Sequence, residues 1–183
     1  MSRNLTFSIS VSLLTLVGSA LAQQSSPPAP TPGPEHARLK KLEGTWDAVM
    51  TEPDGKKTKG EMTYKMECGG LWLCSDFKGE HMGKPFHGKG LDSYDPAAKK
   101  YVGVWVDSWI TSPLRVEGTY DEKTKTATST GECNGPDGKP MKMKMVTKTI
   151  DDDHETFEMY MIGPDGKEMK GATIEYTRRK GGK

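Results

Sequence analysis

Three methionines alternate with two lysines in the segment Met141-Lys142-Met143-Lys144-Met145. In an extended strand every second side chain points to the same face, so this spacing projects three thioether sulfurs from one face. Thioethers are soft ligands that favour Cu(I). The same pattern also fits a half-buried strand whose methionines fill a core and whose lysines face water, and both interpretations stay open.

Two aspartates lie beside aromatic residues. Asp107 lies between Trp105 and Trp109, and Asp92 precedes Tyr94 by two positions. A carboxyl group beside a ring in a desolvated site can have a raised pKa and act as an acid, or it can anchor a polar group of a ligand. The other interpretation, which we expect for both, is an aspartate that accepts backbone hydrogen bonds at the rim of a domain.

The four histidines lack the spacing of metal ligands and are expected at the surface: His36, His81, His87 and His154. His87 lies between Phe86 and Gly88, so it is the candidate for a haem or metal ligand at an opening of the domain. An enzyme would need Asp107, Asp92 or His87 in one cavity. The chain has no nucleophile elbow, phosphate-binding glycine loop or His-Glu-x-x-His zinc motif. We therefore expect no catalysis and no cofactor.

The three cysteines, Cys68, Cys74 and Cys133, have no Cys-x-x-Cys spacing, which argues against a redox motif or a structural zinc site. An odd number of cysteines leaves at least one thiol over. A single disulfide is compatible with the sequence, and the pairing stays undetermined.

The composition limits the classes of partner. The chain has 183 residues, of which 26 are Lys or Arg and 25 are Asp or Glu, for a formal net charge of +1. This length suits one modest domain. Proteins that bind nucleic acid through its phosphates carry a marked basic excess, so no nucleic-acid partner is expected. No apolar run long enough to span a membrane occurs beyond the N-terminus.

Residues 1–22 have the pattern of a signal peptide. Arg3 supplies a positive start, an apolar stretch is richest over 11–21, and Ala20-Leu21-Ala22 is a small-x-small cleavage site. We expect cleavage after Ala22 and a periplasmic or secreted mature protein without a membrane span.

Residues 23–34 contain five prolines and no aliphatic residue larger than alanine, so they are predicted to form a disordered tether. The folded domain is then expected over 35–180. Its first segment, 35–43, has Leu39 and Leu42 three positions apart and no glycine or proline, which predicts about two turns of helix.

After Gly44, apolar residues recur at every second position with polar residues between them, which predicts half-buried β-strands. The recurring positions form six groups: Trp46, Ala48, Met50; Met62, Tyr64, Met66; Val116, Gly118, Tyr120; Met141, Met143, Met145; Phe157, Met159, Met161; and Ala172, Ile174, Tyr176.

The motif Pro-Asp-Gly-Lys occurs three times, at 53–56, 136–139 and 164–167. Proline supplies a fixed φ and glycine a positive φ, so each copy predicts a hairpin turn. With the other turn signals, nine breaks separate ten strands. Ten sequential antiparallel strands avoid exposed edges by closing on themselves. The predicted fold is an all-β, up-and-down antiparallel barrel of about ten strands with one short N-terminal helix; a two-sheet sandwich is the alternative.

The segment Leu42-Glu43-Gly44-Thr45-Trp46 resembles the Gly-x-Trp signature on the first strand of lipocalin-like (calycin) barrels. The resemblance implies that Trp46 closes one end of the barrel and that an arginine of the last strand packs over it. Arg178 shares a face with Tyr176 by the two-residue period, and so stands where the resemblance places that arginine.

A closer resemblance covers nearly all of residues 36–180 and is carried by six segments: 42–46, 83–88, 94–95, 105–108, 157–160 and 163–168. These resemble the exported bacterial family called domain of unknown function 1579. The resemblance implies a ten-stranded calycin-like barrel and no established activity. A more distant likeness is to haem-binding nitrobindin-type barrels, but Ala48 and Met50 stand where those barrels carry glycines, which argues against haem.

A lumen rich in methionine can either be filled as a core or line an adaptable apolar cavity. We expect the barrel to bind a small apolar or amphipathic molecule in its lumen; a haem or soft-metal (copper) protein and a filled barrel without ligand are the alternatives. Neither the ligand nor the oligomeric state follows from the sequence. The expected lining residues are Met50, Met62, Tyr64, Met66, Trp105, Val116, Met143, Met159 and Ile174.

Overall fold

The structure is a computed structural model that describes residues 29–135 and 138–181. The predicted signal peptide over 1–22 and residues 23–28 of the predicted tether lie outside the described residues. By its internal contacts the chain divides after Pro30, and the unit from Thr31 to Lys183 contains every helix and strand that the structure describes.

One α-helix, α1 (Pro34–Lys40), precedes ten strands in the described part of the chain. The helix is shorter than the predicted 35–43, because backbone hydrogen bonds over Arg38–Glu43 turn the chain after Lys40. The strands are β1 (Gly44–Thr51), β2 (Lys57–Glu67), β3 (Trp72–His81), β4 (Lys84–Asp95), β5 (Lys100–Asp107), β6 (Leu114–Asp121), β7 (Thr126–Asn134), β8 (Pro140–Thr149), β9 (His154–Ile162) and β10 (Glu168–Arg178), with a short 3-10 turn η1 (Cys68–Gly70) between β2 and β3.

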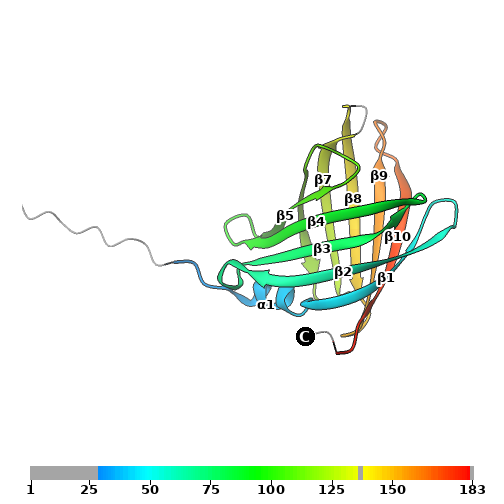
Figure 1. The fold of residues 1–183 in the computed structure, drawn as a ribbon. Coiled ribbons are helices and arrows are strands. Elements are labelled where there is room, and N and C mark those ends of the chain that lie inside the picture. Colours follow the sequence, from blue (N-terminus) through cyan, green and yellow to red (C-terminus); the bar gives the residue numbers. More distant parts are fainter. Residues whose placement is uncertain (1–28, 136–137, 182–183) are drawn as a thin grey trace, which may run out of the picture. The chain divides into compact units, whose positions relative to one another are not determined.

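The ten strands form one closed antiparallel barrel (Figure 1). Each strand pairs with its neighbours in the sequence, and β1 pairs with β10 to close the sheet. Closure leaves no strand edge unpaired, which is the reason given above for preferring a barrel to an open sheet. The predicted up-and-down barrel is confirmed, and the sandwich alternative is wrong.

The repeated Pro-Asp-Gly-Lys motifs lie in hairpin turns. Their glycines, Gly55, Gly138 and Gly166, have φ of 85°, 76° and 77°, in the left-handed region that side chains with a Cβ rarely adopt. Residues 136–137 of the second motif lie outside the described residues. The strands joined by these turns are therefore adjacent in the sheet.

Helix α1 lies against one end of the barrel, where it contacts β2, β3 and β4 (Figure 1). It begins with Pro34, whose missing amide hydrogen costs nothing at the first helical position, and it buries Leu39. Within 29–135 and 138–181, no helix combines the length and the apolar character needed to cross a membrane.

Candidate functional site

The interior of the barrel has two walls of different character. The first, here called the packed wall, comes from β1, β2, β3 and β10. Its buried members are Trp46, Ala48, Met50, Met62, Phe77, Ala172, Ile174 and Tyr176, and four partly exposed side chains pack against them: Tyr64, Phe86, Trp105 and Phe157. Three predicted lining residues, Met50, Met62 and Ile174, belong to this wall, and Tyr64 packs against it. Met66 lies opposite the buried Leu73 near the α1 end.

The packed wall ends at Trp46. The Arg178 guanidinium lies 4.1 Å from the centroid of the Trp46 ring. Arg178 donates hydrogen bonds of 2.6 Å to the carbonyl oxygens of Lys41 and Glu43, and the Trp46 indole N–H donates one of 2.9 Å to Leu42. The segment that links α1 to β1 is therefore fastened to the first and last strands by a ring, a guanidinium and three carbonyl groups.

The second wall, here called the methionine wall, comes from β5 to β9 and the loop after β5. Its buried members are Leu114, Cys133, Met143 and Met145, and its partly exposed members are Trp105, Ile110, Val116, Met141, Phe157, Met159 and Met161. Trp105, Val116, Met143 and Met159 were predicted lining residues. Trp105 and Phe157 also contact the packed wall, whereas the other partly exposed members pack only against the methionine wall.

Glycines widen the interior beside the methionine wall. A Cβ at Gly88 would lie 2.0 Å from the Trp105 ring, and one at Gly90 would lie 3.1 Å from it. The indole ring therefore lies against the backbone of β4 at Gly88 and Gly90, and it also contacts the packed wall. The inward face of β4 can accept such a ring only because these two positions have no side chain.

Polar groups occupy the interior at the α1 end. Tyr64, Tyr176 and Glu155 lie close together, since the charge of Glu155 acts on both phenols. Burial is the main cause that raises the pKa of each tyrosine. Burial also raises the pKa of Glu155, although the Thr149 hydroxyl donates a 2.8 Å hydrogen bond to its carboxylate.

Arg38 of α1 enters the same region. Its guanidinium lies 3.8 Å from the centroid of the Tyr120 ring and 5.1 Å from that of Tyr101. A cavity of about 190 Å³ lies beside it, lined in part by Tyr120, Thr149 and Glu155. The α1 end of the barrel is thus covered by a cation that rests on aromatic rings.

Asp92 lies on the inner face of β4, opposite Leu73 of β3 and Gly103 of β5. A Cβ at Gly103 would lie 2.3 Å from Asp92 Oδ1, so the carboxylate lies against the bare backbone of β5. Burial raises the pKa of Asp92 from 3.8 to about 6, and the positive charge of Arg38 opposes that rise. Asp92 is not the rim aspartate that we expected.

The end of the barrel opposite α1 carries a second interior carboxylate. Glu52 is 5% exposed, and its Oε1 is 2.7 Å from His81 Nδ1 and 3.1 Å from the amide nitrogen of Met82. Its Oε2 is buried and has no hydrogen-bond partner among the described residues. The centroid of the His81 ring lies 4.7 Å from that of the Trp109 ring, with the two planes at 52°.

The contact between Glu52 and His81 is not among the predictions from the sequence. Glu52 continues the two-residue period of Trp46, Ala48 and Met50, and His81 continues the inward phase of Phe77, so the signal was present. The expectation that the histidines lie at the surface is wrong for His36, which is buried beside Tyr94.

Asp107 organises the loop after β5 and takes the backbone-binding role expected for it. Its Oδ1 accepts hydrogen bonds from the amides of Trp109 and Ile110, and its Oδ2 accepts one of 3.1 Å from the Trp105 indole. Trp109 reaches His81 and Ile110 reaches the methionine wall. The loop therefore contacts both sides of this opening.

His87 does not point into the barrel. Phe86 packs against the packed wall and Gly88 is buried, so alternation turns His87 outward. Its Nε2 lies 2.9 Å from Asp76 Oδ1 on the outer face. The idea of His87 as a lumen ligand for haem or metal is therefore wrong, and the structure does not bring His87, Asp92 and Asp107 into one site.

The described residues contain no group of three or more His, Cys, Asp or Glu side chains that could hold a metal ion. All three cysteines are free thiols: Cys68 is exposed, Cys74 is half-buried and Cys133 is buried. Burial raises the pKa of the Cys74 and Cys133 thiols, which keeps them protonated and poorly reactive at neutral pH.

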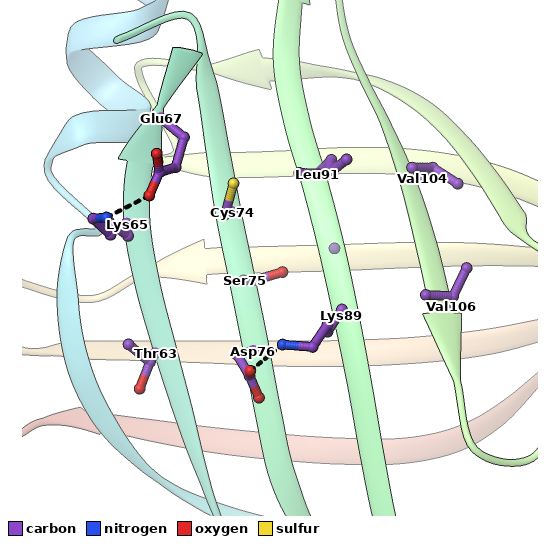
Figure 2. Close-up of a pocket in the computed structure, with 11 residues that line it drawn as sticks. Thr63, Lys65, Glu67, Cys74, Ser75, Asp76, Lys89, Leu91, Val104 and Val106 are labelled. Carbon is purple, nitrogen blue, oxygen red and sulfur yellow. Dashed lines mark hydrogen bonds and ion pairs between the residues drawn. The ribbon is translucent and has the colours of Figure 1, made fainter. Parts of the chain in front are cut away.

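A groove of about 600 Å³ lies on the outer face of β2 to β5. Figure 2 shows Leu91, Val104 and Val106 along one side of it, and the ion pairs Lys65–Glu67 and Lys89–Asp76 across the rest. These charges neutralise each other in pairs. The groove is an external surface that the sequence analysis did not anticipate.

Two solved structures with low sequence identity share the fold. Rv2717c from M. tuberculosis is 14% identical with a TM-score of 0.59, and the match covers 81% of this chain and 99% of that one. The S-type phycobiliprotein lyase CPES from Guillardia theta is 9% identical with a TM-score of 0.54, covering 80% and 93%.

A search of curated proteins found no match. The family model described as protein of unknown function (DUF1579) matches residues 31–178, which include α1 and all ten strands. The chain therefore belongs to the DUF1579 family.

Proposed function

We propose that this protein binds a small apolar or amphipathic molecule inside the barrel, against the methionine wall. The observation that carries the proposal is the unequal burial of the two walls. The packed wall has eight buried side chains, whereas the methionine wall has four, and Met141, Met159 and Met161 pack against it with part of their surface accessible. Covering that surface with an apolar ligand is favourable, at about 25 cal/mol for each Å² removed from water.

The chemistry of the methionine wall supports binding of apolar groups. Methionine is unbranched and has a polarizable sulfur, so its side chain adapts to ligands of different shape. Trp105 lies over Gly88 and Gly90, where side chains would clash with its ring. Polar groups at the two ends, around Asp92 and around Glu52, suit an amphipathic molecule better than a pure hydrocarbon.

The proposal is for binding without catalysis. Asp107 is engaged with the backbone of its own loop, and His87 lies on the outer face with Asp76. The similarity to a phycobiliprotein lyase is one of fold and names no ligand for this chain. A soft-metal site on Met141, Met143 and Met145 remains the second candidate, because all three belong to the same interior cluster.

The test is a titration of the neutral apolar dye Nile red into the wild type and Met159→Trp. We expect saturable binding to the wild type and at least tenfold weaker binding to Met159→Trp, because the indole fills the space that the dye needs. The urea midpoint of Met159→Trp should stay close to that of the wild type, since an open interior accepts added volume.

Met62→Trp is the matched control in the packed wall, where Met62 is 5% exposed. Added volume there has no space to enter, so we expect clear destabilisation. If Nile red does not bind and both tryptophan variants are equally destabilised, the barrel is filled and the proposed function is wrong.

A further inference from the structure

Asp92 is an interior group whose charge can select a class of ligand. Among the residues that the structure describes, none donates a hydrogen bond to the Asp92 carboxylate or forms an ion pair with it. Yet Asp92 keeps part of its surface accessible on the inner face of the barrel. A desolvated carboxylate without a partner is costly, so such a group calls for an explanation.

The nearest charges do not supply a partner. Arg38 attracts Asp92 from a distance, but its guanidinium rests on the rings of Tyr120 and Tyr101. Tyr64 lies near Asp92, since the charge of Asp92 acts on its phenol, and Glu155 adds a second negative charge to the same region. Of the charged groups that the structure describes, Arg38 is the one that acts on the pKa of Asp92, and its guanidinium is held on the Tyr120 ring.

The backbone around Asp92 makes room for its carboxylate. Gly103, directly opposite on β5, has no side chain, and Asp92 Oδ1 occupies the position that a Cβ would need. Val116 lies on the other side of Gly103 and belongs to the methionine wall. The carboxylate thus lies beside the wall that we propose as the binding surface.

We propose that Asp92 binds the cationic head of the ligand, so that the preferred ligands are amphipathic amines; this inference rests on the proposed function. An ammonium group offers charge neutralisation and hydrogen bonds to a carboxylate that lacks both. Apolar parts of the molecule then lie on the methionine wall. A ligand with a carboxylate head is disfavoured, because Asp92 repels it.

The test compares decylamine, decanol and decanoate, which share one chain and differ in the head. Calorimetric titration of the full chain at pH 8, where Asp92 is ionised and the amine is protonated, should give the order decylamine, decanol, decanoate from tightest to weakest. Asp92→Asn should weaken decylamine by about 10- to 100-fold and leave decanol unchanged, since it removes one charged hydrogen-bond partner.

Asp76→Asn is the matched control, because it makes the same chemical change in the outer groove of Figure 2. It should leave all three affinities unchanged. If decanol binds and decylamine binds no tighter, the assignment of Asp92 is overturned, while binding in the lumen stands. If only Asp76→Asn weakens decylamine, the assignment is also overturned, and the amine binds in the outer groove. If none of the three binds, the proposed function itself fails.

Discussion

The two interior walls of this barrel have similar residue types but differ in how far their side chains are buried. The packed wall contains Met50 and Met62, and the methionine wall contains Met143 and Met159. In the first, an aromatic ring fills each gap: Trp46 at the end and Phe77 in the middle are 1% and 3% exposed. In the second, Trp105 lies over Gly88 and Gly90 and contacts both walls, while Met141, Met159 and Met161 stay partly exposed.

The difference shows that methionine content alone does not decide whether a barrel is filled. What decides is whether the large side chains between the methionines point toward the axis or lie along the wall, and this depends on the glycines opposite them. Stability is therefore expected to reside in the packed wall and binding in the methionine wall.

The largest effect is expected at the end of the packed wall. Trp46→Ala should lower the free energy of unfolding by about 3–5 kcal/mol, because it removes a fully buried ring and the platform for Arg178. Urea unfolding followed by circular dichroism measures this. A loss below about 1 kcal/mol would show that this wall is not the source of stability.

A smaller change, a gain in stability instead of a loss, is expected for Asp92→Asn above pH 6. The folded protein holds the Asp92 proton up to a pKa of about 6, whereas the unfolded chain releases it near 3.8. Stability therefore falls as pH rises between these values and stays lower above pH 6, by at most about 3 kcal/mol. Asp92→Asn should remove this loss.

Unfolding of Asp92→Asn and wild type at pH 4 and pH 8 separates these contributions. The variant should be more stable at pH 8 and similar at pH 4. The raised pKa of Glu155 affects both proteins alike and cancels in the difference. Equal stability at both pH values would mean that Asp92 has a partner in solution.

Two truncated methionines, one in each wall, compare the walls directly. Met62→Ala should cost about 2–5 kcal/mol, because it leaves a cavity in a closed cluster. Met159→Ala should cost about 1 kcal/mol, since Met159 already keeps accessible surface. Thermal melts of the two variants provide the comparison, and equal losses would argue that the two walls are packed alike.

The fold was predictable because its signals are local. The two-residue period marks each strand, and the positive φ of Gly55 and Gly166 explains why the repeated motif marks hairpins. When each strand pairs with the next one in the sequence, the pairing of the first strand with the last is the one feature of the fold still to be inferred. The length of the helix was overestimated, because the turn after Lys40 is held by backbone hydrogen bonds that have no sequence signature.

The candidate site was predictable only in part. Alternation along a strand gives the face of a residue, and it located the inward methionines; applied strictly, it also gives the outward direction of His87 and the inward direction of Glu52. The space for the Asp92 carboxylate depends on the missing side chain of Gly103, which lies opposite it on the next strand. That pairing follows from strand register, which residue patterns within one strand do not contain.

Locating a bound apolar molecule in a crystal tests the proposed binding site inside the barrel most directly. Crystals grown with 1-bromodecane would reveal the bromine by its anomalous scattering. Bromine is expected inside the barrel, within contact distance of Met159 or Val116. Bromine found only in the outer groove beside Leu91 and Val106, with the interior free of it, would show that the methionine wall is not the binding surface.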